Sequence, residues 1–562
     1  MINLCIGGAA GEGIETMAGI LEKALQRSGY FVFSMRDFMS RIRGGHNFAQ
    51  IRFGSEPVAA HVDALDILVA YDERTYAEHQ SRLKADGLLL CDPGLGLSDA
   101  RLLPIPIRSL AKESGNARTV GVVCVGALLK LMSLPLANAE AALRETLAPG
   151  ILEMNLTALH KGYESSAEMR RLPPPTASGR LLMTGAEAMA MGALAGGLRF
   201  YSAYPMSPAT SLLTFFTAQS EPLRLMVEQA EDEIAAINMA LGASYAGARA
   251  MVGTSGGGFS LMVEGLGLAG IAELPIVIAD VQRPGPATGL PTRTEQSDLL
   301  FACFASQGEF PRIVIAVRDH ADAFYQTARA FQLAWKYQMP VLLLSDEYLA
   351  DSAATIAPPD VEKAAHSVAP LPREADPPGV YRRYALTDSG ISPLRVPGKS
   401  DGLVRADSDE HAEEGTITES AQVRVQMVDK RARKLEGLKA ELYEPEYTGV
   451  TRPRVLLVGF GSTSAAITEA VSILNSHGLS VGALLFGDVY PLPRKRLEAF
   501  WQQADAVYSV EQNATAQLAK LIRMETGLGC TDSLLKYSGR QLSVDEIVSG
   551  LEAFGIGREV PV

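Results

Sequence analysis

The sequence is poor in cysteine, with only five in 562 residues and no two of them in a CxxC pair. Iron–sulfur clusters and structural zinc sites require closely spaced thiolates, so this spacing excludes both from the chain itself. An odd number of widely separated cysteines is typical of a reducing compartment. We therefore expect a cytoplasmic protein in which the thiols are small buried side chains, at Cys5, Cys91, Cys124, Cys303 and Cys530.

The sequence also lacks an excess of positive charge and long apolar runs. Its net charge of -13 argues against nucleic-acid binding, which needs a basic surface. The most apolar stretch, Val120 to Leu136, contains Lys130 and Pro135, and is too short and interrupted to span a membrane. We expect a buried helix there. The N-terminus has no basic segment followed by an apolar core, so no signal peptide is predicted.

Two further kinds of site have no sequence pattern here. No segment has the GxxxxGK[ST] spacing of a P-loop, which excludes that mode of phosphate binding. Among the eight histidines, only His46 and His411 lie in suggestive settings. Neither has a second histidine or a cysteine three or four residues away, so we assign no metal site.

What the sequence does contain is a repeated alternation of apolar strands and helices. The length corresponds to roughly three to four domains, and the alternation predicts an α/β fold with several doubly wound parallel sheets. Proline-rich and charged stretches separate the segments. The predicted organisation is a βα domain (1–163), a linker (164–180), a second α/β domain (181–357), an extended surface connector (358–449) and a last α/β domain (450–562).

Glycines near the N-terminus separate a predicted strand, Ile2 to Ile6, from a helix that begins near Ile14. Glycine lets the backbone turn tightly and lets N–H groups approach an anion at the start of the helix. A nucleotide or CoA phosphate is one interpretation, and a tight strand–helix turn alone is the other. The candidate residues, including two nearby cations, are Gly8, Gly11, Gly13, Arg41 and Arg43.

The stretch with the most candidate functional motifs lies in the second predicted domain. It contains YPMSP (204–208), an acidic helix start followed by a glycine-rich turn (228–259), and an arginine after an apolar strand (274–286). Ligands of parallel sheets bind beyond the carboxyl ends of the strands, where these segments fall. The stretch therefore predicts one wall of a cofactor cleft, and no segment of the chain supplies the opposite wall.

These blocks resemble the α subunit of 2-oxoacid:ferredoxin oxidoreductases. The N-terminal segments GGAAGEGIETMAG and RIRGGHNFAQIRF are similar to the γ subunit of the same enzymes. The chain is thus identified as a γ–α fusion, nearest in layout to the 2-oxoglutarate-specific enzymes. The resemblance implies a γ-type domain, a pyrimidine-type thiamine-binding domain and a transketolase C-terminal-like domain.

In that family, thiamine diphosphate lies between the α subunit and a β subunit. The resemblance implies that the β subunit carries Mg²⁺ and a [4Fe-4S] cluster, and this chain agrees in having neither a GDG…NN segment nor cluster cysteines. It further implies CoA as a substrate, ferredoxin as the electron acceptor, an α₂β₂ assembly, and oxidative decarboxylation of a 2-oxoacid that could run in reverse.

The resemblance assigns roles to individual residues. Glu233 matches the glutamate that faces the thiamine aminopyrimidine, where a carboxyl favours the imino tautomer that takes the C2 proton. Because Ile234 to Ala236 are apolar, we expect Glu233 to turn inward, unlike Glu231 and Asp232. A helix-dipole partner is the alternative for all three acids.

Substrate contacts are expected from two arginines and a hydroxyl. Arg283 is matched to the C1 carboxylate and Ser207, where the family more often has threonine, to the substrate carbonyl or carboxylate. The structural alternatives are a surface ion pair for Arg283 and a simple turn residue for Ser207. Arg293 is a candidate for the distal carboxylate of 2-oxoglutarate. Other expected contacts are a pocket wall at Tyr204, a close approach of backbone to cofactor at Thr254, Ser255, Gly256 and Gly257, and orienting roles for Gln296 and Asp298.

Rival functions stay open at this point. Specificity for pyruvate, branched-chain or aryl 2-oxoacids is separable only by parallel turnover assays. A non-catalytic CoA- or nucleotide-binding scaffold subunit would form no thiamine site with a partner. An NAD-dependent dehydrogenase is disfavoured because the N-terminal glycines have GxxGxG rather than GxGxxG spacing.

Overall fold

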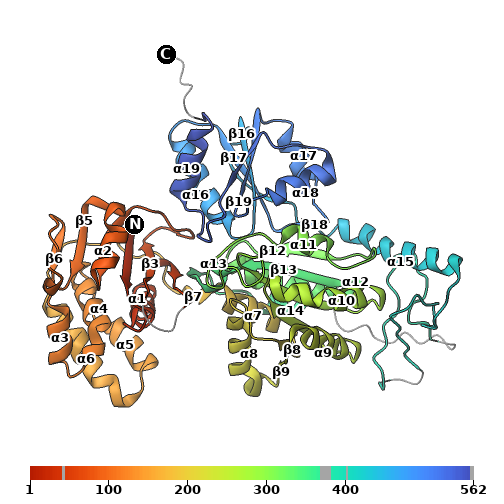
Figure 1. The fold of residues 1–562 in the computed structure, drawn as a ribbon, viewed down its shortest axis with the longest axis horizontal. Coiled ribbons are helices and arrows are strands. Elements are labelled where there is room, and N and C mark those ends of the chain that lie inside the picture. The colour runs from red at the N-terminus through yellow and green to blue at the C-terminus, as the bar shows by residue number, and fades with distance from the viewer. Residues whose placement is uncertain (41–44, 368–380, 400–402, 557–562) are drawn as a thin grey trace. The chain divides into compact units, whose positions relative to one another are not determined.

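The computed structural model describes residues 1–40, 45–367, 381–399 and 403–556. The chain forms two compact units, each of which gathers segments from distant parts of the sequence (Figure 1). The first unit comprises 1–184, 351–358 and 543–545, and the second comprises 185–350, 359–542 and 546–562.

The first unit contains an eight-stranded mixed sheet in the order β6-β5-β4-β1-β3-β2-β14-β7. Strands β1, β4, β5 and β6 are parallel, as expected, but β3, β2, β14 and β7 continue the sheet in antiparallel pairs. The bounds are β1 Ile2–Gly8, β2 Phe31–Asp37, β3 Asn47–Gly54, β4 Leu65–Ala70, β5 Leu83–Cys91, β6 Leu102–Pro104, β7 Leu181–Thr184 and β14 Ala353–Ile356.

Strands β7 and β14 both fall in the range expected for the second domain, yet they extend the first sheet. Short strands gain their stability from pairing rather than from sequence proximity, so this exchange has no local signal.

One face of this sheet is covered by a helical layer and holds the main core of the first unit. The stretch predicted as a buried helix is α4, and ten of its twelve residues are buried, which confirms that expectation. The helices are α1 Ile14–Arg27, α2 Glu73–His79, α3 Ile107–Glu113, α4 Val120–Leu131, α5 Ala137–Thr146 and α6 Pro149–Glu164. No described helix is both long and apolar enough to cross a bilayer.

The second unit is built on a seven-stranded sheet in the order β18-β12-β13-β11-β10-β8-β9. All pairs are parallel except β12 with β18, a strand supplied by the last part of the chain. The strands are β8 Phe200–Ala203, β9 Met226–Gln229, β10 Ala250–Thr254, β11 Ile276–Gln282, β12 Ile313–Ala316, β13 Pro340–Asp346 and β18 Asp488–Tyr490.

Helices connect these strands as the alternation predicted. The two that matter for the site, α9 and α10, lie next to each other and begin directly after β9 and β10. The helices are α7 Gly185–Ala195, α8 Thr210–Leu223, α9 Glu233–Tyr245, α10 Gly256–Ile271, α11 Leu299–Phe304, α12 His320–Tyr337, α13 Glu347–Asp351 and α14 Val361–Ser367.

The last part of the chain forms a five-stranded sheet in the order β15-β17-β16-β19-β20, parallel except for β15. Helix α16 lies on one side of it and α17 and α18 lie on the other, so it is doubly wound (Figure 1). The α/β class with several parallel-sheet domains is thereby confirmed. The elements are β15 Glu446–Gly449, β16 Val455–Phe460, α16 Thr463–Ser476, β17 Val481–Phe486, α17 Lys495–Trp501, β19 Ala506–Glu511, α18 Gln517–Thr526, β20 Asp532–Leu535 and α19 Val544–Ala553.

The segment expected to be a surface connector is partly buried, which corrects that interpretation. Its helix α15 (Ala421–Lys439) inserts Lys430 and Lys434, which are 0% and 1% exposed. Both ammonium groups lie 2.5 Å from carboxylate oxygens of Glu273, itself 1% exposed. Two lysine side chains can be buried here because one carboxylate pairs with both of them.

The cysteines behave as the sequence suggested. All five are free, and four of them are buried; Cys530 is only partly so. Burial raises the pKa of the Cys5 and Cys124 thiols to about 12, which keeps them protonated and unreactive.

Candidate functional site

The candidate site lies at the carboxyl edge of the seven-stranded sheet, where parallel sheets bind ligands. Thr254 ends β10 and is the register partner of Asp280 on β11. Both residues are completely buried, as is Ser255, the residue that precedes α10. The oxygens of the Ser255 hydroxyl and of the Asp280 carboxyl have no hydrogen-bond partner within the described chain. Buried polar atoms normally have partners, so this edge is prepared for a polar ligand.

Glu233 is the first residue of α9, and its side chain turns inward as predicted. Asp232 caps the helix by accepting a hydrogen bond from the Ala235 N–H at 2.7 Å, which leaves Glu233 free for another role. Glu233 is 3% exposed, whereas Glu231 is exposed and Asp232 half-buried. Its Oε1 has no partner within the described residues. A carboxylate oxygen in that state can accept a hydrogen bond from a bound group.

The glycine-rich turn is the first turn of α10 rather than a separate loop, and it needs glycine for space. A methyl group on Gly258 would lie 2.1 Å from the Thr254 hydroxyl and 2.5 Å from Glu233 Oε1. A methyl group on Gly256 would lie 2.3 Å from Asp298 Oδ2. The start of α10 is therefore enclosed by carboxyl and hydroxyl groups, while Gly257 itself is exposed.

Two carboxyl groups at this edge have raised pKa values. Burial, and then the charge of Asp298, raise the pKa of Asp280 well above its ordinary range. Burial, and then Glu295, raise the pKa of Asp298 to about 7. Strongly shifted carboxyls gathered at the end of a sheet are characteristic of functional sites. The sequence predicted an orienting role for Asp298 but no role for Asp280. The residues around an aspartate at the end of a strand do not show whether its side chain is buried.

Two of the expected substrate residues are brought together. Arg283 directly follows β11, and its guanidinium donates a hydrogen bond to the Ser207 carbonyl at 2.5 Å. Burial lowers the pKa of Arg283, but from a starting value of 12.5. Ser207 is exposed, and Tyr204 in the same loop is 41% exposed. The Arg283 and Ser207 side chains thus sit on adjacent loops at the open side of the site.

Arg293 lies further along the loop that begins at Arg283. Its guanidinium donates to the Thr292 carbonyl at 2.8 Å, and the charge of Glu347 acts on it. It is half-buried, and burial lowers its pKa. Arg293 thus lies on the same loop as Arg283, ten residues further along the chain.

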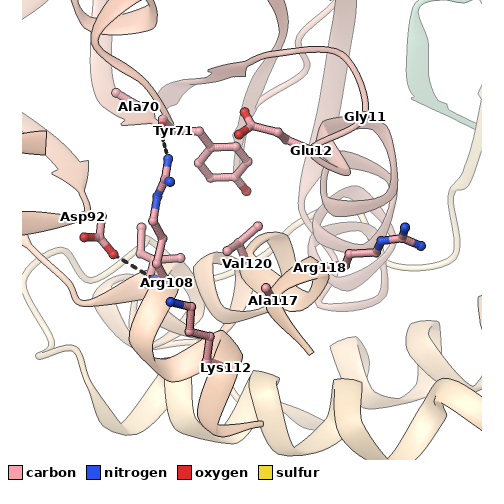
Figure 2. A pocket seen from close by; sticks show the side chains of 11 residues that line it. Gly11, Glu12, Ala70, Tyr71, Asp92, Arg108, Lys112, Ala117, Arg118 and Val120 are labelled. Carbon is pink, nitrogen blue, oxygen red and sulfur yellow. Dashed lines mark hydrogen bonds between the residues drawn. The ribbon is translucent and has the colours of Figure 1, made fainter. Parts of the chain in front are cut away.

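A separate cavity of about 310 Å³ lies in the first unit, beside the N-terminal glycine turn (Figure 2). Three cations line it, two from α3 and one from the segment before α4: Arg108, Lys112 and Arg118. Arg108 is held by a hydrogen bond from its guanidinium to the Tyr71 carbonyl at 3.1 Å. Glu12 and Asp92 also line the cavity and bring two negative charges. The three cations still outnumber the two acids, so the net charge of the lining is positive, which suits an anionic ligand.

Only one of the predicted glycines faces this cavity. Gly11 lines it, Gly8 packs against the Glu12 carboxylate, and Gly13 precedes α1 with φ of 79°. Arg41 and Arg43 lie outside the described residues. The three lining cations were missed because they are about 100 residues from the glycine turn in sequence.

His46, to which the sequence analysis assigned no metal site, lies in a buried cluster with His79, a partner that the sequence did not predict. His46 and His79 are buried with their Nε2 atoms 2.9 Å apart, and a Glu78 oxygen is 3.6 Å from His46 Nε2. Arg82 donates to His79 Nδ1 at 3.1 Å, so His79 carries its proton on Nε2 and donates it to His46. A cation at this cluster would have to reverse that tautomer beside an arginine. The pair is therefore explained as a hydrogen bond.

Family models match three separate parts of the chain. Residues 191–430 match the model described as pyruvate flavodoxin/ferredoxin oxidoreductase, thiamine diP-bdg. Residues 3–165 match pyruvate ferredoxin/flavodoxin oxidoreductase, and residues 454–547 match pyruvate:ferredoxin oxidoreductase core domain II. The thiamine-binding model thus covers the residues of the carboxyl-edge site.

Known proteins are similar over nearly the whole chain. The α subunit of a 2-oxoacid:ferredoxin oxidoreductase from Sulfolobus sp is 33% identical over 97% of this chain and 96% of its own. A 2-oxoglutarate synthase subunit KorA from Archaeoglobus fulgidus is 31% identical over 66% of this chain and 98% of its own. The solved 2-oxoglutarate:ferredoxin oxidoreductase from Magnetococcus marinus, with 2-oxoglutarate, coenzyme A and succinyl-CoA bound, superposes with a TM-score of 0.92. It is 32% identical and covers 98% of this chain and 99% of its own.

Proposed function

Since the chain belongs to the α-subunit family of thiamine-dependent 2-oxoacid:ferredoxin oxidoreductases, we propose that its substrate is 2-oxoglutarate. The reaction is oxidative decarboxylation with CoA to an acyl-CoA and CO₂, with two electrons passed to ferredoxin, and it is reversible with a low-potential donor. Relatives named for 2-oxoglutarate support this choice. Specificity for pyruvate or another 2-oxoacid is the alternative.

The observation that carries the thiamine-dependent chemistry is the buried Glu233 carboxylate with its unpartnered Oε1. It fits the thiamine aminopyrimidine, because a carboxyl beside that ring accepts a hydrogen bond from the ring and the first turn of α10 leaves room near it. Thiamine diphosphate, when bound, supplies the nucleophilic carbon for the 2-oxo group. Glu233 would hold the proton on the pyrimidine side, and Thr254, Ser255, Gly256 and Gly257 would line the ring.

Substrate binding is assigned to the loops at the open side of the site. Arg283 would bind the C1 carboxylate, because its planar guanidinium matches a carboxylate and is already fixed by the Ser207 carbonyl. The Ser207 hydroxyl and Tyr204 would border the same group. Arg293 would pair with the distal carboxylate that distinguishes 2-oxoglutarate from pyruvate.

Arg293→Gln is the variant that tests this specificity in the enzyme co-expressed with its partner subunit. Loss of one charged hydrogen-bonding partner is expected to raise KM for 2-oxoglutarate about 10- to 100-fold and leave pyruvate kinetics unchanged. The matched control is Arg454→Gln, whose side chain is 77% exposed. Steady-state reduction of a viologen dye with each acid gives both constants. A wild-type preference for pyruvate, or equal changes for both acids, would contradict the assignment.

Function also requires a second subunit, which we propose supplies the missing wall. The described residues contain no cysteine cluster, so the [4Fe-4S] cluster and the Mg²⁺-diphosphate site are assigned to a β subunit in an α₂β₂ assembly. Adjacent to the site, α9 and α10 expose apolar side chains at Ile234, Met239 and Leu261 (51%, 41% and 49% exposed). We assign this face to the β subunit because it begins at the incomplete cofactor site.

The cavity of the first unit is proposed to bind the phosphates of CoA. Three cations converge on it beside the start of α1, and CoA is the one substrate of this reaction that carries several phosphates. Glu12 and Asp92 oppose this positive charge only in part. The predicted residues Gly8, Gly13, Arg41 and Arg43 stay candidates for the same ligand.

Arg118→Ala tests the CoA assignment. Removal of one phosphate-binding cation is expected to raise KM for CoA about tenfold without changing KM for the 2-oxoacid. Lys161→Ala serves as the control, because that side chain pairs with Glu113 on the surface. Initial rates at varied CoA concentration measure the effect, and an unchanged KM for CoA would remove the cavity from this role.

A further inference from the structure

The carboxyl edge of the five-stranded sheet is filled by a loop from the other sheet of the second unit. We call residues 283–298, which follow β11 and carry Arg283 and Arg293, the substrate loop. The Gln296 side chain donates a hydrogen bond to the carbonyl of Phe460, the last residue of β16, at 2.7 Å. The Gln296 N–H donates to the Gln512 carbonyl, just beyond β19, at 2.8 Å. Strands β16 and β19 are parallel neighbours, so Gln296 occupies the place where a sheet of this kind would bind a ligand.

Gln512 returns these contacts from the side of the five-stranded sheet. Its N–H donates to Gln296 Oε1 at 3.3 Å, and its side chain donates to the Thr294 carbonyl at 3.2 Å. The Gln512 side-chain oxygen accepts from the Leu542 N–H at 3.0 Å, which fixes the amide. Gln296 is 1% exposed and Gln512 0% exposed. Every hydrogen bond of the pair is therefore shielded from water, where its loss is costly.

A third glutamine anchors the end of the substrate loop. Gln517 opens α18, and its side chain donates to the Ser297 carbonyl at 2.7 Å and accepts from the Leu300 N–H at 2.9 Å. This glutamine is only partly buried. The loop is thus bonded, through both its backbone and its side chains, to the ends of β16 and β19 and to the start of α18.

Two glycines of the five-stranded domain pack closely against the substrate loop. A methyl group on Gly461, where φ is 59°, would lie 2.9 Å from the Gln296 side-chain nitrogen. A methyl group on Gly539 would lie 2.9 Å from Leu290 and 3.1 Å from Arg293 Cβ. At both positions, the side chain of any other residue would clash with the substrate loop.

We propose that the five-stranded domain is a receptor for the substrate loop, and that Gln296, Gln512 and Gln517 are positioning residues that set Arg293 for the substrate. This rests on the proposed function, because it takes the loop to contact the 2-oxoacid. The five-stranded domain itself contributes no side chain to the substrate. It fixes the loop so that the arginine is held in place before binding, which lowers the ordering cost on association.

Gln296→Met tests the proposal in the enzyme co-expressed with its partner, since methionine has a similar volume but neither donates nor accepts strongly. The expected result is a rise of about tenfold in KM for the 2-oxoacid, with kcat and thiamine diphosphate affinity unchanged. Hydrogen–deuterium exchange should show faster exchange in residues 283–298 and unchanged exchange in β10 and β11. The control is Gln502→Met, an exposed glutamine of the same domain.

A second variant covers the case in which Gln296→Met fails to fold. Gln517→Ala removes only the partly buried anchor, and we expect a rise in KM of about threefold with faster exchange near Ser297. An unchanged KM together with unchanged exchange in either folded variant overturns the proposal, as does a loss of thiamine binding equal to the loss of activity. If no 2-oxoacid is turned over by the unaltered enzyme, the proposed function fails while the exchange measurement still tests the anchoring.

Discussion

Glu233→Gln is expected to reduce 2-oxoacid-dependent reduction of the electron acceptor by about 10²- to 10⁴-fold, the usual contribution of a positioned acid–base group. The amide keeps the shape of the side chain and its buried position, but it cannot hold or release the proton at this place. The effect should therefore fall on kcat, and the affinity for thiamine diphosphate should change much less. Single-turnover reduction of an added electron acceptor by the enzyme co-expressed with its partner subunit measures the step directly.

Glu231→Gln is the matched control for that experiment. It lies two residues earlier, is exposed, and carries the same charge change. Its activity should equal that of the unaltered enzyme. If Glu233→Gln turned over normally, or if Glu231→Gln lost as much activity, the carboxylate at Glu233 would not be the catalytic group. Elution of both variants with the β subunit on gel filtration verifies that assembly is intact.

Glu273→Gln is expected to lower the free energy of unfolding of the second unit by about 3–5 kcal/mol, the range for a broken buried ion pair. Lys430 and Lys434 each lie 2.5 Å from this carboxylate, and all three side chains are at most 1% exposed. Without the negative charge, two ammonium groups would remain in the interior without compensation. Arg383, which donates to the Glu273 carbonyl at 2.7 Å, adds a third positive charge nearby. Urea-induced unfolding followed by fluorescence measures the change.

An exposed ion pair provides the control for this prediction, and a variant without the buried charges provides the rescue. Glu436→Gln breaks a surface pair with Lys439, whose two side chains are 69% and 59% exposed, and should cost about 0–1 kcal/mol. The triple variant Glu273→Leu, Lys430→Met, Lys434→Met removes all three charges and should recover most of the loss, because apolar replacement of a buried ion pair is often neutral. Equal effects of Glu273→Gln and Glu436→Gln would show that the cluster adds nothing.

The same cluster predicts a pH dependence with a definite sign. The nearby lysines outweigh burial and lower the pKa of Glu273 from 4.5 to about 2. A carboxyl whose pKa is lowered on folding stabilises the protein at pH values above its unfolded pKa. This contribution is thus complete above pH 4.5 and is lost as the pH falls toward 2. Glu273→Gln should show a flatter stability profile over that acidic range.

Local patterns predicted much of the fold and one half of the site. Strand–helix alternation placed β1 and the start of α1 to within a few residues, because burial and periodicity depend on consecutive residues. The inward turn of Glu233 followed from its apolar neighbours and is confirmed by its burial. The sequence blocks that resemble the oxidoreductase family correctly indicated the family to which the chain belongs.

Long-range pairing was beyond such patterns. Strands β7 and β14 extend the sheet of the first unit, although their neighbours in sequence belong to the second. The segment predicted to be a surface connector buries Lys430 and Lys434. A helix rich in charged residues is expected to be solvent-exposed, and its sequence does not show that Glu273 supplies a buried counter-ion. The cations around the first-unit cavity were missed because they lie about 100 residues from the glycine turn in sequence.

By itself, then, the sequence determined the chemistry available to this protein: an acid at the start of a helix, arginines beyond a strand, and no thiolates for a cluster. Only the tertiary structure decided which of these groups are buried. It also decided which groups are brought together, such as Arg283 with Ser207 and Gln296 with Gln512. The physical reason is that residue type and spacing fix what a side chain can donate or accept. Its burial and its partners depend on segments hundreds of residues away, which meet only when the sheets assemble.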